Sequence, residues 1–282
     1  MPRSISPEKR NTYMALLEKL WQKGEIDADV AARELGLSIV EARRCIDLLA
    51  SKLQWRWIER IPGTSRLILR GRSTFFRALG TRSTEKRKIA ARVVGNYVRP
   101  GDTLALGSGS TAAFIAMELV RQSADVHILT NNAFAFSYLH GMSDSPLEHN
   151  RIECTGGRYH LDRNFFYGPS ALAAFRKRAV TTAIVSLNGI TAEGELLLAS
   201  ALEAEIDREL MRLADGKRRV VVAMDSAKIK VPRGLEVVHV LGDIPARDKG
   251  RYVLATTKPD DASAEAEALD YYRRHVIVDC VT

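Results

Sequence analysis

Residues 102–119 read DTLALGSGSTAAFIAMEL, and this stretch decides the fold of most of the chain. It predicts an apolar strand over 103–106, a turn of small residues, and an amphipathic helix over 110–122. Unpaired N–H groups give a helix N-terminus a partial positive charge, glycines let the backbone approach an anion closely, and hydroxyls add donors. The turn therefore predicts a site for a phosphate group, formed by Gly107, Ser108, Gly109, Ser110 and Thr111.

Three other interpretations of this turn compete with the phosphate site. Gly107-x-Gly109-x-x-Ala112 fits a loose dinucleotide-binding pattern, but that pattern needs an acid about 20 residues later to hold the ribose. The next strand, 126–129, ends in Thr130-Asn131-Asn132 without an acid. A nucleotide-triphosphate loop is excluded because no Lys follows the last glycine. A tight turn that binds nothing stays open.

The composition is typical of a globular protein large enough for two domains. Of 282 residues, 46% are hydrophobic and 27% are charged, and no apolar run approaches the roughly 18 residues of a membrane span. The polar N-terminus lacks the apolar core of a signal peptide, so we expect a cytoplasmic protein with no membrane partner. Cys45, Cys154 and Cys280 lie far apart and predict neither disulfides nor a metal site.

The positive charge is concentrated in the first third of the chain. The net charge is +8, and residues 1–90 hold 19 Lys and Arg against 10 Asp and Glu. Residues 91–282 hold 23 basic and 24 acidic residues. A basic head on a near-neutral body favours a polyanionic partner, and nucleic acid is the first candidate.

The head has the pattern of a winged helix-turn-helix. Helices are expected over 7–23, over 28–35 with Asp27 as cap, and over 38–51 with Ser38 and Glu41 as a capping box. A hairpin is expected over 55–60 and 66–69, around the turn at 62–65. This order of elements is the winged form of the helix-turn-helix.

The third helix is expected to lie in the major groove of DNA, with Arg43 able to pair with guanine. Its candidate base contacts are Ser38, Ile39, Glu41, Ala42 and Arg43. Residues 38–50 carry no net charge, whereas 51–88 contain 11 basic and 2 acidic residues. We therefore expect the wing and the segment after it to contact phosphates through Lys52, Arg56, Arg60 and Arg66, together with Arg70 and Arg72.

After residue 84 short apolar strands alternate with helices, which predicts a mostly parallel α/β sheet covered on both faces. Strands are expected at 103–106, 126–129, 183–187, 219–224, 237–241, 252–255 and 276–279, and helices at 85–98, 110–122, 132–140, 168–179, 200–215 and 262–274. In such sheets ligands bind beyond the carboxyl ends of the strands.

Polar residues follow those strand ends, as amides, acids and a lysine suited to a phosphorylated polyol. Besides the turn at 107–111 they are Thr130, Asn131, Gly157, Asn188, Gly189, Asp225 and Lys228, with Glu203 opening the helix at 200–215. Each also has a purely structural interpretation, as a helix cap, a turn or a solvated side chain. His127 and His160 have no visible partner and are read as non-catalytic.

The order and spacing of these pieces resemble the DeoR family of bacterial transcriptional regulators over nearly the whole chain. The resemblance rests on Glu85-Lys86, Ile89-Ala90, the 107–111 turn, Thr130-Asn131, Gly156-Gly157, Asn188-Gly189-Ile190, Glu193-Gly194, Glu203-Ala204 and 225–228. It implies an N-terminal winged helix and a C-terminal domain that is similar to ribose-5-phosphate isomerase and senses phosphorylated sugars. It also implies a repressor of carbohydrate metabolism that forms dimers or tetramers.

On this basis we expect a DNA-binding domain over 1–70, a linker over 71–84 and an α/β sensor domain over 85–282. The family's arginine pair is kept as Arg43 and Arg44, which assigns Arg44 to DNA binding as well. The usual Thr, Ile and Asp of the recognition helix are replaced by Glu41, Ala42 and Cys45, and the wing lacks its usual His-Gly-Gly. In the sensor, residues common in the family are replaced by Thr181, Ser186 and Asp207, which leaves the identity of the effector open.

Three functions are compatible with this pattern. A DNA-binding regulator with a sugar-phosphate effector explains the basic head and the phosphate turn together, and is the function we expect. A sugar-phosphate isomerase would use Glu203, Asp225 and Lys228, but would leave the basic head without a purpose. A regulator controlled by a protein partner is the third. We therefore expect no catalytic residues, no cofactor and no bound metal.

Overall fold

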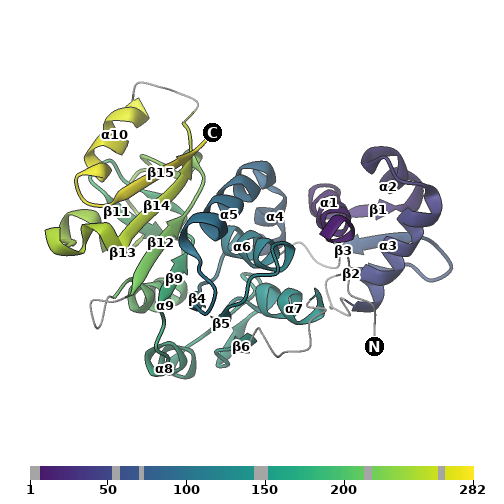
Figure 1. Cartoon of the computed structure of the whole chain (residues 1–282), viewed down its shortest axis with the longest axis horizontal. Coiled ribbons are helices and arrows are strands. Elements are labelled where there is room, and N and C mark those ends of the chain that lie inside the picture. The colour runs from purple at the N-terminus through teal and green to yellow at the C-terminus, as the bar shows by residue number, and fades with distance from the viewer. Residues whose placement is uncertain (1–6, 53–57, 70–72, 143–151, 213–217, 260–263) are drawn as a thin grey trace.

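The computed structural model describes residues 7–52, 58–69, 73–142, 152–212, 218–259 and 264–282 (Figure 1). Its N-terminal part contains α1 (Pro7–Lys23), β1 (Glu25–Asp27), α2 (Ala28–Leu35), α3 (Ile39–Lys52), β2 (Ile58–Arg60) and β3 (Arg66–Leu69). The three strands form one antiparallel sheet in the order β1-β3-β2. The sequence predicts the three helices and the β2–β3 hairpin, but not β1.

Local capping explains why these helices start where they do. The Asp27 carboxylate accepts a hydrogen bond from the backbone N–H of Val30 at 2.7 Å, and α2 ends at Gly36 with φ of 65°. At the start of α3, the N–H of Ser38 donates to Glu41 Oε2 at 3.0 Å, and the N–H of Glu41 donates to Ser38 Oγ at 3.2 Å. This reciprocal pair is the predicted capping box.

The rest of the chain is built on a seven-stranded parallel sheet in the order β15-β14-β12-β9-β4-β5-β6. Its strands are β4 (Thr103–Leu106), β5 (His127–Thr130), β6 (Ile152–Cys154), β9 (Thr182–Val185), β12 (Arg219–Ala223), β14 (Tyr252–Thr257) and β15 (Ile277–Val281). The α/β fold class expected for this part is confirmed.

Helices cover both faces of this sheet because its strand residues alternate between two cores. Leu104 and Leu106 pack with α5, α6 and α7, while Ala105 packs with α8, α9 and α10. The helices are α5 (Ser83–Tyr97), α6 (Ser110–Arg121), α7 (Ala133–Met142), α8 (Pro169–Lys177), α9 (Ala201–Met211) and α10 (Ala264–Arg273), and short 3₁₀ turns cover Ser226–Lys228, Leu241–Asp243 and Ala246–Arg251.

One predicted strand lies elsewhere, and several short ones were not foreseen. The strand expected at 237–241 is β13 (Glu236–Val240), which belongs to a separate antiparallel sheet in the order β10-β11-β13. β13 pairs with β11 (Glu195–Leu198), which in turn pairs with β10 (Gly189–Ile190). A further hairpin joins β7 (Arg158–His160) to β8 (Phe165–Tyr167). Segments of two to four residues are too short to show a periodic pattern.

The segment expected as a linker, 71–84, contains a helix, α4 (Thr74–Gly80). Phe75, Phe76 and Leu79 of α4 are buried, which an exposed linker would not allow. The ring of Trp21 in α1 packs edge-on against Phe134 of α7, with ring centroids 5.5 Å apart. One hydrophobic core therefore runs from α1 through α4 to the helices on the sheet, and Figure 1 shows α4 between α1 and α5.

Candidate functional site

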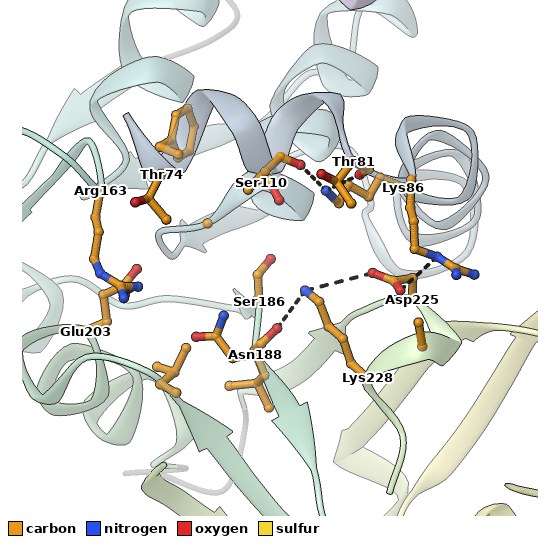
Figure 2. Close-up of a pocket in the computed structure, with 17 residues that line it drawn as sticks. Thr74, Thr81, Lys86, Ser110, Arg163, Ser186, Asn188, Glu203, Asp225 and Lys228 are labelled. Carbon is orange, nitrogen blue, oxygen red and sulfur yellow. Dashed lines mark hydrogen bonds and ion pairs between the residues drawn. The ribbon is translucent and has the colours of Figure 1, made fainter. Parts of the chain in front are cut away.

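A cavity of about 350 Å³ opens at the carboxyl end of the parallel sheet. The chain leaves β4 towards β5 on one side and later returns to β9 on the other, so the connections diverge between β4 and β9. Such a switch point leaves a crevice outside the strand ends. Gly109 and Ser110 after β4, Leu187 and Asn188 after β9, and Asp225 after β12 all line the cavity (Figure 2).

The turn after β4 brings the N-terminus of α6 to the cavity. Gly109 has φ of 101°, a conformation that favours glycine, and a Cβ there would lie 3.0 Å from the Cβ of Ser186. The Asn132 side chain donates to the Gly109 carbonyl at 3.1 Å and holds the turn from behind. The backbone can therefore approach a ligand closely, and the Ser110 hydroxyl points into the cavity.

Glu203 lies at one end of the cavity with both carboxylate oxygens engaged. Ser108 Oγ donates to Oε1 at 3.0 Å, and the Arg163 guanidinium lies 2.8 Å from Oε2. Burial raises the pKa of the Glu203 carboxyl, and the charge of Arg163 opposes that rise.

Lys228 lies at the other end. Its ammonium donates to the Leu187 carbonyl at 2.8 Å and lies 3.9 Å from the Asp225 carboxylate. Asp225 also pairs with Arg82, whose Nε is 3.1 Å away. Burial lowers the pKa of Lys228, because the charged form loses water that its partners replace only in part.

A second lysine, Lys86 of α5, is buried at this end. Only 3% of Lys86 is exposed, and its ammonium donates to the Thr81 carbonyl at 2.6 Å and to the Ala78 carbonyl. Burial, and then the charge of Lys228, lower the pKa of Lys86 to about 7. Four basic side chains, Arg82, Lys86, Arg163 and Lys228, thus line the cavity with two carboxylates, Glu203 and Asp225. A bound anion would offset this excess of positive charge.

Six of the residues predicted as ligand-binding line this cavity: Gly109, Ser110, Asn188, Glu203, Asp225 and Lys228. The other seven lie outside the lining. Ser108 holds Glu203, as described above. Thr130 Oγ1 donates to the Leu106 carbonyl, and Asn131 donates to the Phe166 carbonyl. Thr111 is fully buried.

The remaining three glycines of that set meet protein atoms at short range. A Cβ at Gly107 would lie 3.2 Å from Asp207 Oδ1. At Gly157, whose φ is 105°, it would lie 2.5 Å from the Tyr167 carbonyl oxygen, and at Gly189 it would lie 2.1 Å from Val231 Cγ2. Close packing between chain segments accounts for a glycine at each of these positions.

Much of the lining comes from residues that the sequence did not indicate. Thr74, Phe75, Ala78, Thr81 and Arg82 belong to the expected linker, and Arg163 belongs to the unforeseen β7–β8 hairpin; Lys86, Ser186, Leu187, Leu198 and Ala227 complete the set. Lys86 was visible only as part of a family motif. Nothing in the local sequence indicates that α4 closes over the strand ends.

The predicted DNA-contacting residues are only partly available. Ser38, Ile39, Glu41, Arg43 and Arg44 are exposed on α3, but Glu41 is engaged in the capping box. Ala42 is fully buried and cannot reach a base, so that prediction is wrong. In the wing, Arg60 pairs with Asp47 at 2.7 Å and Arg66 pairs with Glu25. Arg56 and the side chain of Lys52 lie outside the described residues, as do Arg70 and Arg72.

Comparison with known proteins adds a family match. The family model of the DeoR C-terminal sensor domain matches residues 81–241. Proteins named HTH-type transcriptional regulator UlaR from Shigella dysenteriae serotype 1 and Escherichia coli O1:K1 are each 25% identical over 225 residues, which cover 79% of this chain and 84% of theirs.

Solved structures resemble the chain only weakly. A ribose 5-phosphate isomerase from Methanocaldococcus jannaschii is 17% identical with a TM-score of 0.34, over 58% of this chain and 59% of its own. A likeness of that size carries no argument about function. Among the described residues, no helix has the length and apolar character needed to span a membrane.

Proposed function

Because this chain belongs to the DeoR family, we propose that it is a DNA-binding transcriptional regulator whose cavity binds a phosphorylated sugar. Its relatives are named as transcriptional regulators. The observation that carries the ligand class is the cavity at the sheet's switch point, where the N-terminus of α6 and four cations face only two carboxylates. This arrangement favours a ligand with at least one phosphate group.

The proposed contacts divide between the phosphate and the sugar hydroxyls. Gly109 and Ser110 at the start of α6 line the cavity together with Lys228, and Figure 2 shows Ser110 and the Lys228 ammonium facing the same space. We assign these three residues to the phosphate. Ser186 Oγ is buried and has no hydrogen-bond partner among the described residues, so a sugar hydroxyl would satisfy it. Asn188, whose Oδ1 accepts from the Ala199 N–H, can present its amide nitrogen to another hydroxyl.

DNA binding is proposed for residues 1–70, with α3 as the recognition helix of a winged helix-turn-helix. The arrangement of α2, the Gly36 turn and α3 beside an antiparallel sheet supports this, and Arg43 and Arg44 are both exposed on α3. The sensor domain extends over 85–282, with α4 between the two. A repressor role in carbohydrate metabolism, a homo-oligomer and a cytoplasmic location belong to the same proposal.

An isomerase is disfavoured by the state of its candidate base. An isomerase needs a carboxylate that is free to take a proton from substrate carbon. Glu203 instead accepts from Ser108 and pairs with Arg163, and Asp225 pairs with Arg82. These contacts suit a fixed binding site better than proton transfer.

A thermal-shift screen tests the ligand class. The purified chain is heated with ribose 5-phosphate, glucose 6-phosphate, fructose 1-phosphate, glycerol 3-phosphate and orthophosphate. A true ligand present at about 100 times its Kd stabilises the protein by about 2.7 kcal/mol. Lys228→Met is expected to lose the shift, while Lys177→Met, at an exposed position on α8, is expected to keep it. If no compound raises the melting temperature of wild type, or if Lys228→Met shows the same rise as wild type, the proposed cavity function fails.

A further inference from the structure

The segment Thr74–Lys86 lies between the cavity and the helix α1 of the head. Thr74, Phe75, Ala78 and Thr81 face the cavity, and they are followed by the cations Arg82 and Lys86. Gly80 meets α1 instead, where a Cβ would lie 2.9 Å from the Trp21 carbonyl oxygen. This segment is therefore in contact with both the candidate ligand site and the head.

Each end of α4 is held by a residue that lines the cavity or adjoins one that does. At the N-terminal end, Asp162 Oδ1 accepts from the Thr74 N–H at 2.8 Å and the Asp162 carbonyl accepts from the Phe75 N–H at 3.2 Å. The next residue, Arg163, lines the cavity and pairs with Glu203. At the C-terminal end, the Lys86 ammonium binds the carbonyls of Ala78 and Thr81 and so satisfies groups that the end of a helix leaves unpaired.

On the other side, polar contacts and aromatic packing fasten the end of α1 to the same segment. Gln22 Nε2 donates to Ser83 Oγ at 3.0 Å, and Glu18 pairs with Arg87 of α5. The Trp21 ring packs against Phe134, which also contacts Phe75 of α4 at a centroid distance of 5.8 Å. A displacement of α4 would therefore disturb α1, because a close-packed interior has few voids into which α4 could move without pushing its neighbours.

We propose that the segment Thr74–Lys86 transmits ligand occupancy from the cavity to the head, because Lys86 and Asp162 hold the two ends of α4 while Lys86 and Arg163, the neighbour of Asp162, line the cavity. A phosphate that draws the Lys86 ammonium towards itself takes it from the carbonyls of Ala78 and Thr81. A ligand that engages Arg163 moves the neighbouring Asp162, which holds the other end of α4. The displacement of α4 is an equilibrium between two positions of this helix, one without and one with ligand. The ligand shifts that equilibrium to the extent that its affinity differs between the two positions. The inference rests on the proposed ligand-binding function of the cavity.

Hydrogen exchange of the full chain tests this route, with the panel compound that gives the largest thermal shift as the probe. In wild type, the ligand is expected to change exchange in α1 at least threefold, in addition to protecting the cavity segments. Gly80→Ala places a methyl group against the Trp21 backbone without entering the cavity, so cavity protection should persist while the change in α1 is lost. Gly95→Ala is the matched control, since it is also a helical glycine and its Cβ would meet nothing within 4 Å.

A second variant keeps the test decisive if Gly80→Ala does not fold. Asp162→Ala removes the carboxylate that accepts from the Thr74 N–H, at an exposed residue outside the lining, and should raise exchange in α4 about fivefold while weakening the ligand's effect on α1. An unchanged α1 in liganded wild type overturns the inference, as does a wild-type α1 response in both variants. The proposed function fails separately, and the inference with it, if no panel compound stabilises wild type.

Discussion

Replacement of Asp207 by Asn should stabilise the protein by an amount that grows with pH. Asp207 is fully buried in α9, and neither carboxylate oxygen has a hydrogen-bond partner among the described residues. Burial, and then the charge of Glu203, raise the pKa of Asp207 well above 3.8. The folded protein therefore holds a proton on Asp207 that the unfolded chain releases above that pH.

The direction and size of the effect follow from proton linkage. Because the folded state binds the extra proton, the stability linked to Asp207 is complete below pH 3.8 and declines as the pH rises towards the folded-state pKa. The decline is about 1.4 kcal/mol per pH unit across that interval. Asn resembles the protonated acid in shape and cannot ionise, so wild type and Asp207→Asn should be similar in acid and diverge as the pH rises.

Urea unfolding at a series of pH values between about 5 and 8 measures this divergence. Glu205→Gln, an exposed position on the same helix, is the control and should leave the pH dependence of wild type unchanged. Parallel stability curves for wild type and Asp207→Asn would refute the conclusion that Asp207 is buried as a neutral acid.

Three further predictions concern the head, a turn and the buried lysine. Arg43→Ala and Arg44→Ala should each weaken binding to duplex DNA, by about 1–3 kcal/mol where the arginine contacts a base. Fluorescence anisotropy at two salt concentrations measures the affinity, and an unchanged affinity in both variants contradicts the assignment of α3 as recognition helix. Gly157→Ala should lower the free energy of unfolding, measured in urea, by more than about 1 kcal/mol, because φ is 105° and the new Cβ would lie 2.5 Å from the Tyr167 carbonyl oxygen. Gly156→Ala, with open space around its Cβ, should lower it by less, and equal losses in the two variants would contradict the clash. The pKa of Lys86 is about 7 in the folded protein and 10.5 in the unfolded chain, so the free energy of unfolding of wild type relative to Lys86→Met should rise with pH between these values. If urea unfolding shows the same difference between the two proteins at every pH, Lys86 is not desolvated.

Local interactions allowed the sequence alone to predict most elements and six of the seventeen residues that line the candidate site. The caps at Asp27 and Ser38 join groups three residues apart, so the starts of α2 and α3 could be read directly. The glycine turn before α6 and the alternation of strands and helices along the chain were sufficient to predict the parallel sheet. Ligands of such sheets bind at the strand ends, which allowed the prediction that residues as distant in sequence as Gly109, Asn188 and Lys228 share one site. All three line the cavity.

Tertiary packing decided what the local pattern could not. The 71–84 segment is a short stretch between two strong patterns, and only the aromatic cluster around Phe134 explains why α4 folds there and closes the cavity. Lys86 and Arg163 have unremarkable sequence neighbours, and their roles depend on carbonyls and a carboxylate supplied by other elements. Ala42 is on α3, yet the face it occupies points into the core. Sequence determines contacts between near neighbours in the chain, whereas burial and charge pairing arise from segments that meet only in the folded protein.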